Sequence, residues 1–117
     1  MIPEQQSNRP QNTRRYPRYD FDSEIKATVS TFRGQEVTKG RSLNLNEGGV
    51  GGAFVTGWDV GTEVNLQFSV PTSVSPLLVK GVIRNRVSHS YGFEFVDLNE
   101  HQQLTVARAC RTLALMQ

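Results

Sequence analysis

Cysteine and histidine are scarce in this chain, and their scarcity excludes several kinds of site. Cys110 is the only cysteine, so the chain can form neither an internal disulfide nor a thiolate metal cage. The two histidines, His89 and His101, have no further His, Cys or paired carboxylate at the spacing of metal ligands. We therefore expect no metal and no cofactor, and this cysteine usage favours a cytoplasmic location.

Long apolar runs are also missing. Residues 1–12, MIPEQQSNRPQN, lack the apolar segment of a signal peptide, and nowhere do about 18 apolar residues follow one another. The sequence therefore predicts no membrane insertion. Because residues 1–12 are rich in Gln, Asn and Pro and have little to bury, we expect a flexible leader followed by one domain over residues 13–117.

Catalytic motifs are absent too. Cys110 falls in a predicted helix near its apolar stripe, which is typical of a small core residue rather than a nucleophile. The glycine cluster EGGVGGAF, residues 47–54, matches neither the phosphate-loop pattern nor the dinucleotide-binding pattern. We therefore predict that the protein is not an enzyme.

The chain does contain a series of short segments in which apolar residues alternate with polar ones. Ile25, Ala27 and Val29 recur at every second position, which is the period of a half-buried strand. Glycine turns are expected at 33–35 and 57–61. The expected strands cover residues 23–32, 36–45, 52–56, 64–70, 77–87 and 90–97. About six closely spaced strands without intervening helices favour an antiparallel barrel or sandwich.

The period changes after residue 97, where we expect a single helix. Asn99 and Gln102 have the spacing of a capping pair. The predicted apolar stripe consists of Leu104, Ala107, Cys110 or Arg111, and Ala114. We expect this stripe to pack on the strands, and a partner-binding role for the rest of the helix is the alternative.

Positive charge is concentrated near the N-terminus. The net charge is only +2, yet the first twenty residues contain four arginines against two acidic residues. In TRRYPRYD, residues 13–20, three of these arginines surround Pro17, which cannot join a regular β-ladder. A solvated basic tail is one interpretation, and a site for one anionic ligand is the other.

A second polar cluster ends one of the predicted strands. In NLNEGG, residues 44–49, Asn44 and Asn46 are two positions apart and so point to the same side of a sheet. The glycines that follow allow a ligand to approach the backbone closely. An ordinary turn is the alternative interpretation, because Asn and Gly are both favoured in turns.

In this order and spacing, the two clusters resemble the motifs of the PilZ domain family over roughly residues 13–115. Arg14 and Arg18 match the paired arginines of the first motif. Asn44 and Gly49 match the first and last positions of the second motif, [Asp/Asn]-x-Ser-x-x-Gly, and Asn46 stands where the family usually has serine. The resemblance implies a mainly all-β fold, a six-stranded antiparallel β-barrel with a C-terminal α-helix.

The resemblance also implies a ligand, cyclic diguanylate (cyclic di-GMP), which is a bacterial second messenger. The implied ligand-binding residues are Arg14, Arg18, Asn44, Asn46 and Gly49, with Arg15 as a secondary candidate. An arginine fork can meet O6 and N7 of guanine with two hydrogen bonds, and other guanidinium groups can meet the phosphodiester oxygens. We expect residues 1 to about 20 to be mobile until the ligand orders the arginine arm and changes the surface seen by a downstream protein partner.

Two alternatives remain open. One is a PilZ-like adaptor that has lost nucleotide binding and acts by protein contacts, which the departure at Asn46 allows. The other is a small β-barrel that binds nucleic acid by stacking bases on Tyr16, Tyr19 and Phe21. The expected ligand is the cyclic dinucleotide and no nucleic acid.

Overall fold

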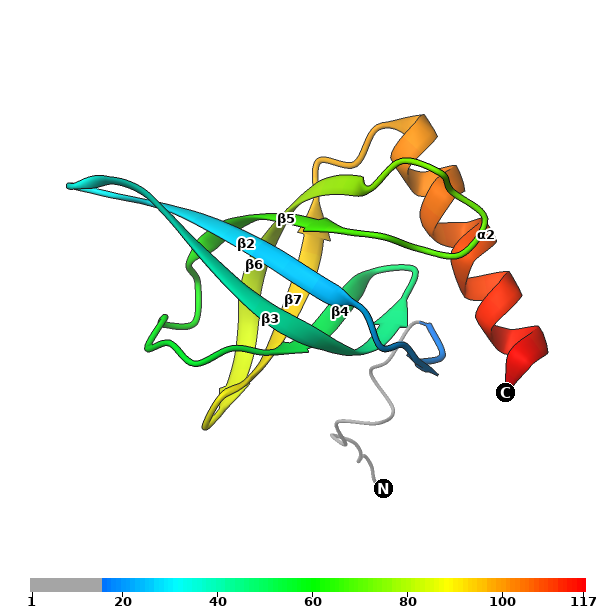
Figure 1. The fold of residues 1–117 in the computed structure, drawn as a ribbon, viewed down its shortest axis with the longest axis horizontal. Helices are drawn as coiled ribbons and strands as arrows, with labels where there is room; N and C mark the ends of the chain where they lie inside the picture. Colours follow the sequence, from blue (N-terminus) through cyan, green and yellow to red (C-terminus); the bar gives the residue numbers. More distant parts are fainter. Residues whose placement is uncertain (1–15) are drawn as a thin grey trace, which may run out of the picture.

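Antiparallel strands form a sheet that closes on itself, and one helix lies against an end of the resulting barrel (Figure 1). The computed structural model describes residues 16–117, so the predicted leader lies outside the described residues. The elements are β1 (Tyr19–Asp20), β2 (Glu24–Thr31), β3 (Gly34–Asn46), β4 (Gly49–Ala53), β5 (Glu63–Phe68), β6 (Leu77–Val87), β7 (Ser90–Val96) and α2 (Glu100–Met116).

The barrel has six strands in the order β3-β2-β5-β6-β7-β4, and β4 pairs back with β3 to close it. The two-residue strand β1 is an addition, and it pairs with β3 through Tyr19 with Leu45 and Asp20 with Asn44. The predicted six-stranded antiparallel barrel with a C-terminal helix is therefore confirmed, with one short extra strand.

The interior is filled by the alternating residues that the sequence indicated. Ile25, Ala27 and Val29 are buried on β2, and the alternation that starts at Val64 is buried on and just after β5. Phe54, Tyr91 and Phe93 form an aromatic group in the core, with ring centroids 5.7–6.2 Å apart. The period of two predicted these strands correctly because each one buries a single face.

The strand predicted over residues 52–56 is wrong in its bounds, because β4 starts three residues earlier. A β-carbon at Gly49 would collide with the carbonyl oxygen of Phe93 on β7. The glycines therefore lie within the strand and permit close backbone approach, instead of forming a loop before it. Phe54 then leaves the strand, with its amide bonded to the carbonyl oxygen of His89 at 2.9 Å.

Helix α2 begins with the predicted cap. The Asn99 side chain accepts from the Gln102 amide and the Gln102 side chain accepts from the Asn99 amide, both at 2.8 Å. The predicted apolar stripe is shifted in phase and only partly right. Cys110 is buried as predicted, but Leu104 and Ala114 are exposed, and the other buried residues are Val106, Ala109 and Leu113.

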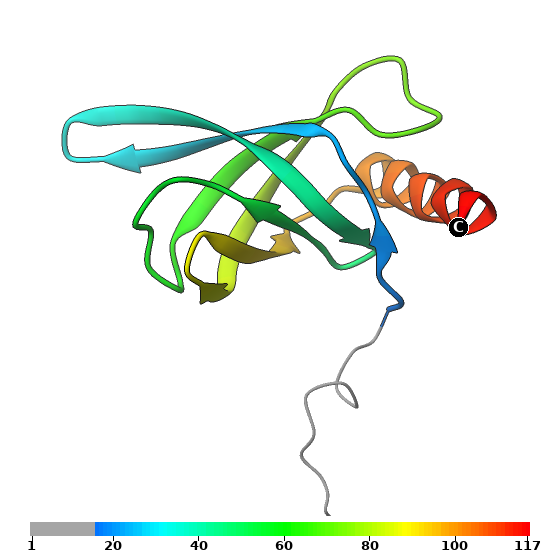
Figure 2. The same ribbon diagram turned by 60° about the horizontal axis from the view of Figure 1, so that its bottom comes forward.

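The physical reason for this phase error is the breadth of the apolar arc of α2. Alanine and leucine occur on more than one side of the helix, so periodicity alone does not identify the buried side. The helix contacts β1, β3 and β6 and lies across one end of the barrel (Figure 2). That docking direction selects the side that carries Val106 and Leu113.

At the opposite end, the β2–β3 hairpin projects away from the barrel (Figures 1 and 2). Its turn is formed by Phe32 and Arg33 and ends at Gly34, whose φ of +113° is readily adopted only by glycine. The glycine turn predicted at 33–35 is confirmed within one residue. No helix among residues 16–117 has the length and apolarity needed to cross a bilayer.

Candidate functional site

A cavity of about 700 Å³ lies on the barrel wall where β3, β4, β7 and β6 run side by side. It is lined by four of the predicted site residues, Arg18, Asn44, Asn46 and Gly49. Arg14 and Arg15 precede residue 16 and lie outside the described residues. The structure therefore brings the described members of both sequence clusters to one place.

Arg18 reaches the cavity from the segment that precedes β1. Its side chain is exposed, and its guanidinium makes no hydrogen bond or ion pair to any of residues 16–117. Tyr16 lies over the turn before β4, since a β-carbon at Gly48 would come within 3.2 Å of the Tyr16 ring. At the end of this segment, Tyr19 and Asp20 pair with β3.

Asn44 is turned toward the cavity by a β-bulge in β3. Ser42 pairs with Gly52 and Asn44 with Gly51, so that Leu43 is the extra residue. Ser42 and Leu45 are both buried, which leaves Leu43 and Asn44 together on the outer face. Bulges commonly re-aim side chains in this way near binding sites.

Asn46 has a local role in addition to its place in the cavity. Its Oδ1 accepts a hydrogen bond from the Gly48 amide at 2.6 Å, which closes an Asx turn. The turn interpretation of this residue is therefore supported, and its amide nitrogen remains without a partner among the described residues. Gly49 does not shape the turn by a positive φ; it allows β4 to approach Phe93 on β7.

Sequence reasoning missed the β6–β7 side of the cavity. Arg84, Asn85, Gly92 and Glu94 line it, and Nε of Arg84 donates to Glu94 at 2.6 Å. A second bulge lies here, since Ile83 pairs with Phe93 and Asn85 with Gly92. The signal in the sequence is the polar run Arg84-Asn85-Arg86, which interrupts the alternation of the predicted strand.

Arg86 is held within the fold and is not free for a ligand. Its guanidinium carbon lies 5.3 Å from the centroid of the Tyr91 ring, and the group donates to the carbonyl oxygens of Ser88 and Trp58 at 2.9 and 3.1 Å. Arg84 is neutralised by Glu94. Among the described residues, Arg18 is therefore the cation in the cavity wall that has no acidic partner.

Cys110 lies in the core of the barrel end, as the sequence predicted. Burial, and to a smaller extent the nearby charge of Glu47, raise the pKa of its thiol to about 11. A neutral thiol in such a place is not a nucleophile. Within residues 16–117, no group of three or more His, Cys, Asp and Glu could hold a metal ion.

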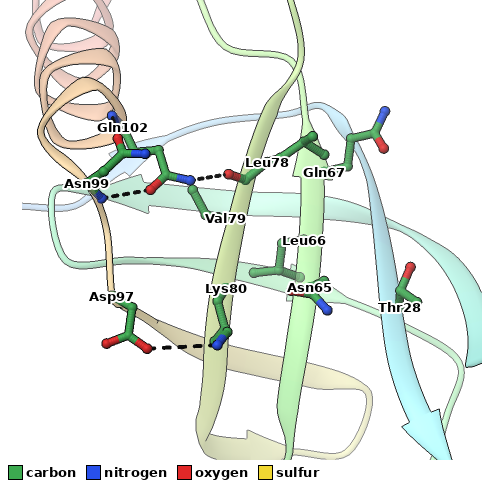
Figure 3. A pocket seen from close by; sticks show the side chains of 10 residues that line it. All are labelled: Thr28, Asn65, Leu66, Gln67, Leu78, Val79, Lys80, Asp97, Asn99 and Gln102. Carbon is green, nitrogen blue, oxygen red and sulfur yellow. Dashed lines mark hydrogen bonds and ion pairs between the residues drawn. The ribbon is translucent and has the colours of Figure 1, made fainter.

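A second hollow, of about 530 Å³, lies at the start of α2 (Figure 3). Some of its polar groups already have partners: Lys80 lies 3.8 Å from Asp97, and Nε2 of Gln102 donates to the carbonyl oxygen of Leu78 at 2.6 Å. The cavity that contains Arg18 and Asn44 is the better candidate, because it gathers the described residues of both sequence clusters.

The aromatic residues named for base stacking do not form one surface. Phe21 is buried and packs edge-on against Phe68, with ring centroids 5.9 Å apart. Tyr19 packs against the core, and Tyr16 alone of the three lines the cavity. This arrangement disfavours a nucleic-acid track along Tyr16, Tyr19 and Phe21.

Comparison with known proteins gives a consistent result. The PilZ domain family matches the sequence over residues 12–111. No curated protein matches the chain by sequence. Among solved structures, the Bacillus subtilis inhibitor of motility (MotI/DgrA) is similar, with a TM-score of 0.75 and 17% identity over 89% of this chain. The chain spans 52% of that protein, so about half of its length has no counterpart here.

Two further solved structures are single PilZ domains. One is from the CeSA protein of a cellulose-synthesizing bacterium, with a TM-score of 0.62 and 16% identity over 79% of this chain and 92% of that one. The other is the PilZ domain of Escherichia coli YcgR with c-di-GMP, with a TM-score of 0.70 and 12% identity over 89% of this chain and 93% of that one. At these identities the likeness is one of fold.

Proposed function

The chain belongs to the PilZ domain family, and from this premise we propose that it is a non-catalytic receptor for cyclic di-GMP. The observation that carries the proposal is the single cavity lined by Arg18 of the first motif and by Asn44, Asn46 and Gly49 of the second. The similar domain of YcgR was solved with this ligand, which supports the choice of dinucleotide.

The chemistry of the cavity suits a guanine dinucleotide. Arg18 is exposed and has no ion pair among the described residues, so its fork is free to meet O6 and N7 of a guanine or an anionic phosphate. Arg14 and Arg15 stand a few residues earlier on the same arm and supply further guanidinium groups. Two or three such contacts of about 1–3 kcal/mol each, with stacking, approach the roughly 8 kcal/mol of a micromolar complex.

The signal would pass from the arm to the barrel end. The segment that carries Arg18 continues into β1, and β1 lies between β3 and the end of α2. A ligand that binds the arginine side chains would order this segment and alter the surface formed by the arm and α2. A protein partner that recognises this surface would read the nucleotide concentration.

An adaptor that acts by protein contacts alone is the second candidate. It is favoured by one observation, namely that Asn46 replaces the usual serine and already uses its side-chain oxygen on Gly48. Such a protein would keep the fold and the projecting hairpin without binding nucleotide.

Calorimetric titration with cyclic di-GMP separates the two candidates. We expect the wild type to bind in the submicromolar to tens-of-micromolar range, and Arg14→Ala or Arg18→Ala to abolish or severely weaken binding. Arg33→Ala is the matched control, because it removes the same charge at the exposed tip of the β2–β3 hairpin. If the folded wild type does not bind, the adaptor is favoured. If Arg14→Ala and Arg18→Ala both bind at full strength, these arginines do not contact the ligand.

A further inference from the structure

One edge of β3 is unpaired in the part of the strand that projects beyond the barrel. Strand β2 covers the other edge from Gly34 to Arg41, whereas β4 pairs with β3 only from Arg41 onward. Within the part of the chain that the structure describes, residues 35–39 therefore have one neighbouring strand instead of two. This stretch lies in the hairpin that extends away from the barrel in Figures 1 and 2. A strand edge of this kind can accept a further strand.

The turn of the hairpin decides which backbone groups of β3 point outward. It contains two residues, so Thr31 and Gly34 form the hydrogen-bonded closing pair. Because hydrogen bonding alternates along an antiparallel ladder, every second residue of β3 bonds to β2, and the residues between them direct their N–H and C=O groups outward. The outward-directed residues of the free stretch are Gln35, Val37 and Lys39. Each of them contributes one donor and one acceptor to the open edge.

The side chains of the free stretch suit a copy of the same stretch. Val37 lies at its centre, and 58% of its side chain is exposed. Glu36 and Lys39 are the only charged residues between Gly34 and Gly40, so the stretch carries no net charge. It also lacks the proline and the bulge by which sheet edges are commonly protected, since its register with β2 is continuous.

We propose that the free edge of β3 pairs with the same edge of a second copy of this chain, antiparallel and about a two-fold axis at Val37. In this register Val37 faces Val37 of the second copy, and Gln35 faces Lys39 of the second copy. All outward-directed backbone groups of the free stretch then gain partners, and the two hairpins form one four-stranded sheet. The inference goes beyond the proposed function, because this pairing needs no nucleotide.

Strand geometry and charge exclude the neighbouring registers. Facing residues in an antiparallel pair must both direct their backbone groups outward or both direct them inward, so the centre of the pairing moves one residue at a time and stays on a residue. A centre at Glu36 would set two carboxylates directly opposite each other, which is destabilising. A centre at Thr38 would pair Gln35 with Arg41 of the second copy, although β4 already occupies that position. The centre at Val37 is the one that uses the whole free edge.

This register also places a suitable polar neighbour opposite each charge. The carboxylate of Glu36 faces Thr38 of the second copy, whose hydroxyl can donate a hydrogen bond to it. The ammonium group of Lys39 faces Gln35 of the second copy, whose side-chain oxygen can accept one. No like charges lie directly opposite each other within residues 35–39. The pairing covers a small area, so we expect a weak dimer with a dissociation constant of about 10–500 µM.

Sedimentation velocity of the full chain without nucleotide tests the pairing between about 5 µM and about 1 mM. We expect the wild type to become dimeric toward the upper end and Val37→Lys to stay monomeric, because two like charges then face each other on the axis. Val74→Lys, in the exposed loop between β5 and β6, is the matched control and should dimerise as the wild type does. A wild type that is monomeric at the highest concentration, or equal dimerisation of Val37→Lys, would overturn the proposal.

A further variant separates edge pairing from association through the hairpin tip. Phe32 is the exposed aromatic residue of the turn, with 93% of its surface accessible. Because edge pairing depends on the backbone of residues 35–39, Phe32→Ser should retain the dimer. If Phe32→Ser becomes monomeric while Val37→Lys remains dimeric, the tip and not the edge makes the contact.

Disulfide cross-linking tests the register itself. The native Cys110 is buried, so a cysteine introduced in the hairpin is the thiol that reacts. Under mild oxidation, we expect Val37→Cys to cross-link with itself, and Gln35→Cys with Lys39→Cys in an equal mixture, at least about tenfold faster than Thr38→Cys with itself. Faster cross-linking of Thr38→Cys would overturn the register. Because no cyclic di-GMP is present, these results are independent of whether the receptor function holds.

Discussion

The side-chain amide of Gln117 makes two hydrogen bonds to the main chain of Asp20. Nε2 donates to the carbonyl oxygen at 2.7 Å, and Oε1 accepts from the amide nitrogen at 2.9 Å. Asp20 faces β3 on its other side, so Gln117 occupies the outer edge of β1 as a neighbouring strand would. The residue that follows α2 thereby holds the strand to which the arginine arm is joined.

Gln117→Ala should loosen the base of the arm without unfolding the barrel. Two exposed hydrogen bonds contribute about 1 kcal/mol together, so we expect faster amide exchange at Asp20 and cyclic di-GMP affinity that is several-fold weaker. Hydrogen exchange detected by mass spectrometry measures the first effect and calorimetry the second. Gln35→Ala, in the exposed hairpin, is the matched control. Unchanged exchange at Asp20 would show that Gln117 does not hold β1.

Ligand should order the segment that precedes β1. We expect saturating cyclic di-GMP to slow amide exchange between Arg14 and Tyr19, because contacts to the guanidinium groups restrict the backbone that carries them. Strand β6, whose core side chains are already buried, should change far less. Hydrogen exchange with and without nucleotide measures the difference. Equal exchange in the arm under both conditions would contradict the ordering mechanism.

Asn46 should tolerate serine better than leucine. A serine hydroxyl can also accept from the Gly48 amide, so Asn46→Ser should keep the turn and retain or modestly improve nucleotide affinity. Asn46→Leu should lower the free energy of unfolding by about 1 kcal/mol and weaken binding, because the amide of Gly48 loses its acceptor. Urea unfolding and calorimetry measure the two effects. Full affinity in Asn46→Leu would place residue 46 outside the contact set.

Removing the acid from the cavity should strengthen binding of an anion. Arg84 and Glu94 are both about half exposed, so their pair contributes little to stability, but the carboxylate lies in the cavity wall. We expect Glu94→Gln to raise cyclic di-GMP affinity several-fold and Arg84→Met to lower it, with both effects reduced at high salt. Asp97→Asn is the matched control, since it removes an acidic charge outside this cavity. Equal effects of Glu94→Gln and Asp97→Asn would mean that only net charge matters.

The thiol of Cys110 should make stability depend on pH in the alkaline range. Burial is the main cause that raises its pKa to about 11, with the charge of Glu47 second, whereas an unfolded thiol ionises near pH 8.5. Between these values the unfolded chain releases a proton that the folded chain retains. Stability is therefore unaffected by this group below about pH 8.5 and falls by up to roughly 1.4 kcal/mol per pH unit toward pH 11.

Urea unfolding of the wild type and Cys110→Ala between pH 8 and pH 10.5 measures this contribution. Other groups titrate in the same range, so the informative quantity is the difference in slope between the two proteins. We expect the wild type to lose stability more steeply. Parallel slopes, or rapid alkylation of Cys110 in the folded protein at pH 8, would contradict a buried neutral thiol.

The sequence by itself determined the features that depend on near neighbours along the chain. The alternation from Ile25 to Val29 predicted a half-buried strand, and the pair Asn99 and Gln102 predicted the cap of α2. Both succeeded because the period of a strand and the geometry of a cap are set within a few residues. The family resemblance also placed Arg18 and Asn44 as site candidates, and both line one cavity.

The tertiary structure decided what depends on contacts between distant segments. The buried side of α2 could not be predicted because several sides are apolar, and the barrel end that chooses among them is made of strands far earlier in the chain. The bulges at Leu43 and Arg84 lie 41 positions apart in the sequence, yet they bring Asn44 and Asn85 into one row, with glycines of β4 and β7 between them. Backbone pairing across four strands, which no local pattern encodes, creates that row and the space over its glycines.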